Sequence, residues 1–217
     1  MNVINLNGVK GVTTGDSYTC ARLADGTVEC WGYNYYGQIG SGDTQTPVYP
    51  QAKIQDLSNV TTVAAKWEHT CALLADQTAK CWGQNSYGAL GNGTLVDSSH
   101  PVVVSGLSRA TAITVGLGFS CALLSDKTVS CWGSDGTSVL STTPTNLAGL
   151  SSVKEISSGA SHTCALMTDE TVKCWGLNLY GQLGDGTNTN RASPVAVVGL
   201  SGVKSISAGT SVRLKAE

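Results

Sequence analysis

The stretch HTCALMTDETVKCWGLNLYGQLGDGT, residues 162–187, contains the pattern that decides the fold. Nine residues centred on an Asp separate its two cysteines, and Trp-Gly follows the second cysteine. The same arrangement occurs four times, with steps of 51, 50 and 43 residues between the first cysteines. Self-similarity at such a period is typical of repeat proteins, in which one supersecondary unit is stacked several times. The sequence therefore predicts a repeat architecture.

Each unit contains four short segments with strand character and little that resembles a helix. In the fourth unit, VKEIS (153–157) alternates apolar and polar residues, which is the period of a strand. TCALM (163–167) and TVKCWG (171–176) flank a turn and predict a hairpin. SPVAVVG (193–199) is the expected fourth strand, with its proline at the start, where a missing N–H donor is tolerated.

Four strands in about 50 residues, repeated along a chain, are the pattern of β-propeller blades. We therefore predict an all-β propeller, or an open propeller segment, as a single repeat domain over residues 1–217. The expected units are approximately 9–57, 60–107, 110–150 and 153–200, with a partial fifth unit at 203–217.

The spacing of each cysteine pair fits a disulfide across a β-hairpin. In CARLADGTVEC, a three-residue loop would place Asp25 at the end of a type I turn and Gly26 in the left-handed conformation of a bulge. Counting outward from this loop brings Cys20 opposite Cys30 at a non-hydrogen-bonded site, where Cα atoms lie about 4.5 Å apart. A two-residue loop would put Cys20 opposite Trp31 instead. Because a disulfide can span that distance, we predict the pairs Cys20–Cys30, Cys71–Cys81, Cys121–Cys131 and Cys164–Cys174.

Eight cysteines in four regular pairs indicate an oxidising compartment. Free buried thiols in a cytosolic protein are the alternative. A zinc site or a haem attachment site is disfavoured, because no C-x-x-C occurs in the sequence. We expect an extracellular or cell-surface protein whose signal peptide lies outside this chain, since MNVINLNGVKGV has no basic segment followed by an apolar one.

Composition argues against two classes of partner. Charged residues are only 13% of the 217, the net charge is −2, and like charges form no block. These values are unlike those of proteins that bind nucleic acids or acidic membrane surfaces. No apolar run approaches the roughly 20 residues of a membrane helix. We expect a protein partner or self-association, with no nucleic acid, no membrane insertion, no cofactor and no metal.

The shared motif of the units, G-x-x-H/Y-T-C-A-L…C-W-G-x-N-x-Y-G-Q-L-G-x-G-T…P, resembles the RCC1 (regulator of chromosome condensation) repeat. It is most similar to the cysteine-bearing version found in bacterial extracellular proteins, and it covers nearly the whole chain. The resemblance implies a β-propeller with four-stranded blades, usually seven of them. It also implies a choice of roles: guanine-nucleotide exchange on a small GTPase, β-lactamase inhibition by a secreted member, or a plain binding platform.

The chain departs from this family pattern in three ways. Four full units are present where seven would close a ring. The third unit has SDGTSVLSTT (134–143) in place of the N-x-Y-G-Q-L-G segment. The fifth unit leaves the pattern after its first segment, and Leu214 stands where a cysteine is expected. We expect one of three outcomes: a tighter closed ring of four blades, a segment of a longer propeller, or open edges that pair head to tail between chains.

Histidine is the usual place to look for catalysis or metal binding. His69 and His162 stand two residues before a first cysteine, and the other units have Tyr18 and Phe119 there. A position that accepts His, Tyr and Phe is interpreted as a packing position for a ring. His100 has no evident acidic or nucleophilic partner in the sequence. We find no combination of nucleophile, base and oxyanion donor, and we expect a protein that is not an enzyme.

Three further motifs are interpreted as structural. The GxGT segments at 91–94 and 184–187 lack the lysine of a P-loop and recur as repeat turns. DGTNTN (185–190) has oxygen ligands but lacks the later Glu of an EF-hand loop. The sequons at Asn59 and Asn92 matter only in a host that glycosylates.

Four aromatic residues are candidate contacts for a partner. Trp67 is the one Trp outside the repeated position, and we interpret it as replacing a Gly found at Gly15 and Gly159. Tyr33, Tyr35 and Tyr36 form the one aromatic cluster in a loop.

Three functions are therefore weighed. The first is a non-catalytic extracellular protein-binding or structural scaffold, with head-to-tail self-assembly as one form of it. The second is a secreted inhibitor of an extracellular enzyme, which the aromatic loop cluster would favour. The third is a guanine-nucleotide exchange regulator, against which the disulfides and the absence of a basic tail argue.

Overall fold

The computed structural model describes residues 6–137 and 141–209. Within these residues sixteen strands form four antiparallel sheets of four strands each, and no helix occurs among them. The all-β propeller-blade prediction is confirmed. We call the sheets blades 1 to 4 in chain order.

Each blade has its strands in chain order. Blade 1 consists of β1 (Val9–Thr14), β2 (Tyr18–Leu23), β3 (Val28–Gly32) and β4 (Val48–Lys53). Blade 2 consists of β5 (Val60–Lys66), β6 (His69–Leu74), β7 (Ala79–Gly83) and β8 (Ser98–Val103). Blade 3 consists of β9 (Ala110–Val115), β10 (Phe119–Leu124), β11 (Val129–Gly133) and β12 (Ser141–Asn146). Blade 4 consists of β13 (Val153–Ser158), β14 (His162–Met167), β15 (Val172–Gly176) and β16 (Arg191–Ala196).

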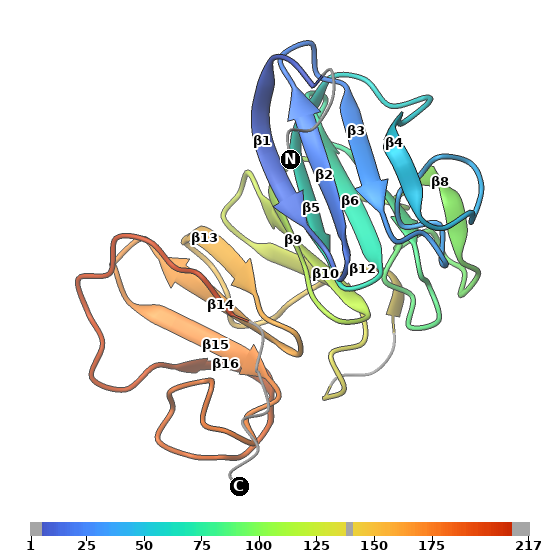
Figure 1. The fold of residues 1–217 in the computed structure, drawn as a ribbon. Coiled ribbons are helices and arrows are strands. Elements are labelled where there is room, and N and C mark those ends of the chain that lie inside the picture. The colour runs from blue at the N-terminus through green and yellow to red at the C-terminus, as the bar shows by residue number, and fades with distance from the viewer. Residues whose placement is uncertain (1–5, 138–140, 210–217) are drawn as a thin grey trace, which may run out of the picture.

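The blades follow one another side by side, so the chain forms an open stack. The first strands β1, β5, β9 and β13 lie next to one another along the inner rim. The blue blade 1 and the orange blade 4 lie at opposite ends of the molecule (Figure 1). Each of these two blades therefore has one broad face that no complete neighbouring blade covers.

The hairpin between the second and third strands has the register that the cysteine spacing predicts. Leu23 N donates to Thr27 O at 2.9 Å, and Cys20 pairs with Cys30. The four disulfides of the structure join Cys20–Cys30, Cys71–Cys81, Cys121–Cys131 and Cys164–Cys174, each with Cα atoms 4.1 Å apart. The pairs in blades 2 to 4 have the same register in their own hairpins.

The loop of this hairpin adopts the left-handed backbone even where the residue is not glycine. Gly26 has φ +76°, and Gln77, Lys127 and Glu170 have φ of 67°, 66° and 65° at the equivalent position. The preceding Asp stabilises the turn, because its Oδ1 accepts hydrogen bonds from both the N and the Oγ1 of a Thr two residues later. This Asp–Thr pair is present in all four hairpins: Asp25–Thr27, Asp76–Thr78, Asp126–Thr128 and Asp169–Thr171.

The outer strand differs from the sequence prediction. In blade 4 it spans Arg191–Ala196 rather than 193–199, and Pro194 lies inside the strand, not at its start. The reason is a bulge: Cys174 pairs with Val195 and Gly176 pairs with Arg191, so three outer residues face one inner residue. Because an edge strand with a bulge needs no ladder hydrogen bond there, it tolerates proline. The outer strands of blades 2 and 3 contain Pro101 and Pro144 at the same place, and in blade 1 Pro50 lies in the bulge one position earlier.

The hydrophobic core lies between blades, not within one. Between blades 1 and 2 it contains the first disulfide together with Val28, Ile39, Val60 and Trp82, all buried. Equivalent clusters fill the spaces between blades 2 and 3 and between blades 3 and 4. Since each blade is stabilised by its neighbours, as in other repeat proteins, the two end faces are the exceptional surfaces of the molecule.

Candidate functional site

The ring position two residues before each first cysteine is part of the core. Tyr18, His69, Phe119 and His162 are all buried, as the packing interpretation requires. Glycine precedes three of these rings because there is no room for a side chain. A Cβ on Gly15 would lie 1.8 Å from the Tyr18 ring, and one on Gly116 would lie 2.0 Å from the Phe119 ring.

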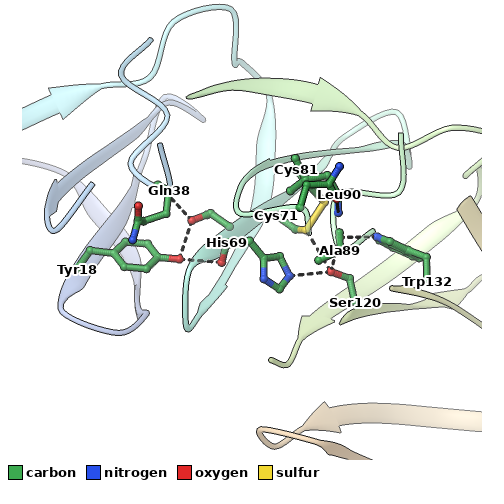
Figure 2. The surroundings of a disulfide bond; sticks show 11 residues. Tyr18, Gln38, His69, Cys71, Cys81, Ala89, Leu90, Ser120 and Trp132 are labelled. Atoms are coloured by element: carbon green, nitrogen blue, oxygen red, sulfur yellow. Dashed lines mark hydrogen bonds between the residues drawn. A yellow bond between two sulfur atoms is a disulfide. The ribbon is translucent and has the colours of Figure 1, made fainter. Parts of the chain in front are cut away.

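Two of these rings also connect neighbouring blades through hydrogen bonds (Figure 2). The hydroxyl of Tyr18 donates to the main-chain oxygen of His69 at 2.7 Å and lies 2.9 Å from Thr70 Oγ1. His69 Nε2 lies 2.9 Å from Ser120 Oγ in blade 3. The chain of polar contacts thus runs from blade 1 to blade 3 along the inner side of the stack.

A second polar contact recurs at each junction that the structure describes fully. Between blades 1 and 2, Trp82 Nε1 and Thr70 Oγ1 both donate to the Gln38 carbonyl, each at 2.9 Å. Between blades 2 and 3, Trp132 Nε1 and Ser120 Oγ both donate to the Ala89 carbonyl, at 2.7 and 3.0 Å. The equivalent acceptor for blade 4 falls within residues 138–140, outside the described residues. We call this pair of donors on one carbonyl the junction clamp.

Burial shifts the pKa values of the two histidines and of Tyr18 so that the uncharged form of each side chain is favoured. It lowers the pKa of His69 to about 4, so this imidazole is neutral at pH 7. It also lowers the pKa of His162, with a smaller contribution from the Lys66 ammonium. Burial raises the pKa of the Tyr18 hydroxyl well above its ordinary value. These groups act as packing and hydrogen-bonding elements of the junctions.

The structure corrects the position assigned to Trp67. The residue that stands where Gly15, Gly116 and Gly159 stand, five positions before the first cysteine, is Lys66. Trp67 is one position later, so the sequence comparison that paired Trp67 with those glycines was wrong by one residue. The hairpin register shows this directly, since Lys66 pairs with His69 at the end of β5 and β6.

Lys66 was not among the residues that the sequence singled out. In the structure its side chain connects blade 2 with blade 4. Its Nζ donates to the main-chain oxygen of Ser158 in blade 4 at 2.6 Å and lies 3.5 Å from that of Ala208. Burial lowers its pKa. Trp67 accepts a hydrogen bond from Asp16 N through its carbonyl at 3.0 Å, and its buried Nε1 has no hydrogen-bond partner among the described residues. A lysine at a glycine position is the signal that could have revealed this contact.

In the tyrosine cluster Tyr33 and Tyr35 are exposed, Tyr36 is half-buried, and the rings contact one another. The rings of Tyr33 and Tyr35 stack with centroids 6.4 Å apart, and Tyr35 meets Tyr36 edge to face at 5.0 Å. Tyr35 is 60% exposed. The negative charge of Glu68 raises the pKa of Tyr36. Tyr87 and Tyr180 occupy the place of Tyr36 in the loops of blades 2 and 4, and both are exposed.

The glycine-rich loops are structural, as interpreted from their recurrence. A buried Asn organises each one: Asn85 Oδ1 accepts from Leu90 N at 2.9 Å, and its Nδ2 donates to Thr94 O at 3.0 Å. Asn34 and Asn178 make the corresponding bonds in blades 1 and 4. In the DGTNTN segment, the Asp185 carboxylate accepts from Asn178 and pairs with Arg191 at 2.8 Å. Both carboxylate oxygens of Asp185, which a bound cation would need as ligands, are therefore engaged by protein side chains.

Two absences among the described residues bear on other classes of site. No group of three or more His, Cys, Asp or Glu side chains is arranged to hold a metal ion in residues 6–137 and 141–209. Over the same two ranges, no helix is long and apolar enough to cross a membrane.

Comparison with sequence families identifies the repeat. The profile of the regulator of chromosome condensation (RCC1) repeat matches residues 9–38, 60–89, 110–137 and 153–182 in one version and residues 25–73, 81–123 and 170–212 in another. Curated relatives match part of the chain. The Ultraviolet-B receptor UVR8 of Arabidopsis thaliana is 40% identical over 95 residues, which are 43% of this chain and 21% of that protein. The E3 ubiquitin-protein ligase HERC2 of Homo sapiens is 32% identical over 113 residues, which are 49% of this chain and 2% of that protein.

Solved structures share the fold at low sequence identity. Human WBSCR16 aligns with a TM-score of 0.86 and 24% identity, over 95% of this chain and 57% of that one. Yeast RCC1 (Prp20), solved bound to Kap60, aligns with a TM-score of 0.79 and 21% identity, over 93% of this chain and 52% of that one. The chain thus spans a little over half the length of these propellers and at most about a fifth of the two curated relatives.

Proposed function

Because the chain belongs to the RCC1 repeat family, whose profile matches more than half of its residues, we propose that it is a non-catalytic, extracellular protein-binding or structural scaffold. The observation that carries this proposal is the exposed tyrosine cluster on a stack of blades held by disulfides and junction clamps. Aromatic side chains that are exposed on rigid supports are typical of protein-binding surfaces, because they bury much area at little cost in conformational entropy.

Solved propellers of the same fold support a role in protein binding. Yeast RCC1 (Prp20) has been solved bound to Kap60. A second crystal structure of Prp20p was described together with the binding of that protein to Gsp1p and histones. These propellers bind other proteins, and a fold shared at about 20% identity does not transfer their partners to this chain. The partner of this chain therefore has to be found by experiment.

An extracellular location is proposed from the cysteines. All eight are paired within their own hairpins, and no free cysteine occurs in the structure. Such disulfides persist in oxidising compartments. Thiol titration of the protein isolated from its native source should find no free thiol, and eight reduced cysteines would contradict this location.

A lack of catalytic activity is proposed from the state of the candidate residues. His69 is neutral and hydrogen-bonded within a blade junction, and Tyr18 is likewise buried in one. Neither ring is open to a substrate, and both have structural contacts that account for their presence.

The test of the binding role uses two variants of blade 1. The double variant Tyr33→Ser/Tyr35→Ser removes the stacked pair, and Tyr49→Ser removes a tyrosine that is 70% exposed on the outer strand β4. Each immobilised chain is incubated with the secreted proteins of the source organism. We expect a protein retained by wild type and Tyr49→Ser to be lost from the double variant, and equal retention by all three would contradict the proposal.

One observation favours the enzyme-inhibitor alternative. Four of the exposed tyrosines of the described residues, Tyr33, Tyr35, Tyr87 and Tyr180, lie in the loops that follow Trp-Gly, and Tyr49 on β4 is the exception. Loops on a rigid scaffold are a common place for specific recognition. If the retained partner is a secreted enzyme, its activity should fall in the presence of wild type and not in the presence of the double variant.

Self-assembly head to tail is the structural form of this scaffold role. It is proposed because blades 1 and 4 each have one face without a complete neighbour, and because charged residues are only 13% of the chain.

A further inference from the structure

The chain contains the same first-strand element twice, once at each end. Residues 8–15 read GVKGVTTG and residues 202–209 read GVKSISAG, identical at four of eight positions and similar at the other four. Gly8 and Gly202 have φ of 69° and 71°. The second copy comes after blade 4, where the first strand of a fifth blade would begin.

Residues 203–209 lie against blade 4 as a first strand lies against the preceding blade. Val203 N donates to Glu170 O at 3.1 Å, as Val60 N donates to Gly26 O at 3.0 Å. Ala208 N donates to Ser157 Oγ at 2.9 Å, and the equivalent bond between blades 1 and 2 joins Ala65 N to Thr13 Oγ1 at 3.1 Å. The side chains of Val203 and Ile206 pack on the apolar cluster of blade 4.

Among residues 6–137 and 141–209, this element has no strand partner, whereas the other four first strands have one. β1, β5, β9 and β13 each form an antiparallel ladder with the following strand. Within the described part of the chain, residues 203–209 belong to no ladder. One row of their backbone N–H and C=O groups thus makes no ladder bond to the described residues, and such an edge is the usual route to pairing with a strand of another chain.

At the opposite end of the molecule, blade 1 has an apolar face that no preceding blade covers among the described residues. The face of blade 1 that points away from blade 2 exposes Val12 by 60% and Val9 by 40%, whereas their counterparts Ile113 and Val153 are buried. Trp31 Nε1 donates no hydrogen bond to the described residues. The main-chain oxygen of Gln182 in blade 4 occupies the place of the main-chain oxygens of Gln38 and Ala89, and it accepts no hydrogen bond from the described residues. Blade 1 thus has the donor of a junction clamp, and blade 4 has its acceptor.

We propose that residues 203–209 of one copy pair with β2 of a second copy in place of that copy's own β1, so that copies of this chain join head to tail by strand exchange. The inference rests on the self-assembling scaffold function proposed above. Exchange of an equivalent element between protomers is a low-cost route to assembly, because the new ladder repeats the bonds of the old one. In the joint, Trp31 Nε1 of the second copy donates to Gln182 O of the first.

The burial of the two elements explains why exchange is favoured over simple docking. The strand β1 is exposed at almost every position, so its displacement removes little apolar surface from a core. Val203 and Ile206 are already packed on blade 4 and stay there in the joint. Docking of an intact β1 on blade 4 would instead require residues 203–209 to leave the place that both elements fit.

The test compares one substitution at the two equivalent positions, Val12→Asp and Ile206→Asp. Val12 lies on the displaced strand, and Ile206 lies on the exchanged strand. Sedimentation velocity of the purified 217-residue chain over a wide concentration range should show species above the 22.3 kDa monomer for wild type and Val12→Asp. Ile206→Asp should sediment as a monomer. Circular dichroism of each variant verifies that the four blades are folded.

Trp31→Phe is the second variant, because it keeps an aromatic ring on blade 1 and removes only the donor of the clamp. We expect its self-association to be about five- to tenfold weaker than that of wild type, which corresponds to one lost hydrogen bond. Unchanged association of Trp31→Phe or Ile206→Asp overturns the proposal, and so does a monomeric Val12→Asp.

Self-association is measured without a partner, so its failure is distinct from failure of the binding role. A wild-type chain that is monomeric at every concentration refutes strand exchange, and the tyrosine variants still report on partner binding. Intact self-association with equal partner retention by all tyrosine variants refutes the binding role alone.

Discussion

The indole Nε1 of Trp132 in blade 3 donates a hydrogen bond to the main-chain carbonyl of Ala89 in blade 2 at 2.7 Å. Ser120 Oγ donates to the same carbonyl oxygen at 3.0 Å, so both lone pairs of a buried acceptor are used. The contact lies within an apolar interface, where an unsatisfied carbonyl would cost more than it does in water. The junctions of blades 1 and 2 and of blades 2 and 3 thus combine burial of apolar side chains with one polar clamp each.

Trp132→Phe should destabilise the protein by about 1–3 kcal/mol, through a lost hydrogen bond and a smaller ring in a close-packed interface. Urea unfolding followed by circular dichroism measures the change. Trp31→Phe is the matched control at protein concentrations low enough that the chain is monomeric, since Trp31 is at the end face and then has no such acceptor among the described residues of its own chain. Equal destabilisation by both substitutions would show that the clamp contributes nothing specific.

The buried imidazole of His69 should make stability depend on pH. Burial lowers its pKa from 6.5 to about 4 in the folded state, so the unfolded chain binds a proton more readily. The contribution is fully present above pH 6.5 and is lost as the pH falls from 6.5 towards 4. The free energy of unfolding should therefore fall by up to about 3 kcal/mol in this window. Thermal unfolding at a series of pH values measures it.

His69→Phe is the control for this pH dependence. Phe119 occupies the equivalent position in blade 3, so a phenyl ring is compatible with the site. The variant should lose most of the slope between pH 6.5 and 4, and the remaining slope is assigned to His162 and, near pH 4, to aspartates such as Asp185, whose pKa values are also lowered. A slope as steep as that of wild type would contradict the assignment to His69.

Removal of the disulfide of blade 2 should cost about 2–3 kcal/mol, the entropic value for a closed loop of about ten residues. The double substitution Cys71→Ala/Cys81→Ala tests this by urea unfolding, because both cysteines are fully buried and alanine adds no polar group. Peptide mapping of wild type under non-reducing conditions provides the control for connectivity. Any linkage between cysteines of different blades would contradict the hairpin register.

The left-handed turn residue offers a stabilising substitution. Gln77 has φ 67° and an exposed side chain, so Gln77→Gly relieves a backbone conformation that side chains disfavour. Part of that gain is offset by the greater freedom of glycine in the unfolded chain, and a net increase of about 0.5 kcal/mol is expected. Gly26→Ala, at the same position of blade 1, should have the opposite sign, since its Cβ would lie 3.2 Å from Asn59 Cα. Stability changes of the same sign in both variants would contradict this explanation.

Local spacing explains what could be predicted. The pairing of Cys20 with Cys30 follows from counting residues on either side of a three-residue loop, which is a property of one hairpin. The position of Pro194 inside its strand could not be predicted by such counting. It depends on the bulge in the pairing of β16 with β15, which the residue spacing of the hairpin does not determine. Nor does a hairpin count show that Lys66 reaches Ser158, 92 residues away.

The sequence alone determined the repeat, the four-stranded unit and the disulfide in each hairpin, because side-chain alternation and loop length act between residues close in the chain. Only the tertiary structure decided which carbonyls Trp82 and Trp132 contact, and that residues 203–209 lie on blade 4 without a ladder partner among the described residues. Those relationships depend on the angle and distance between neighbouring blades. Packing of whole sheets sets these quantities, and no spacing within a single unit encodes them.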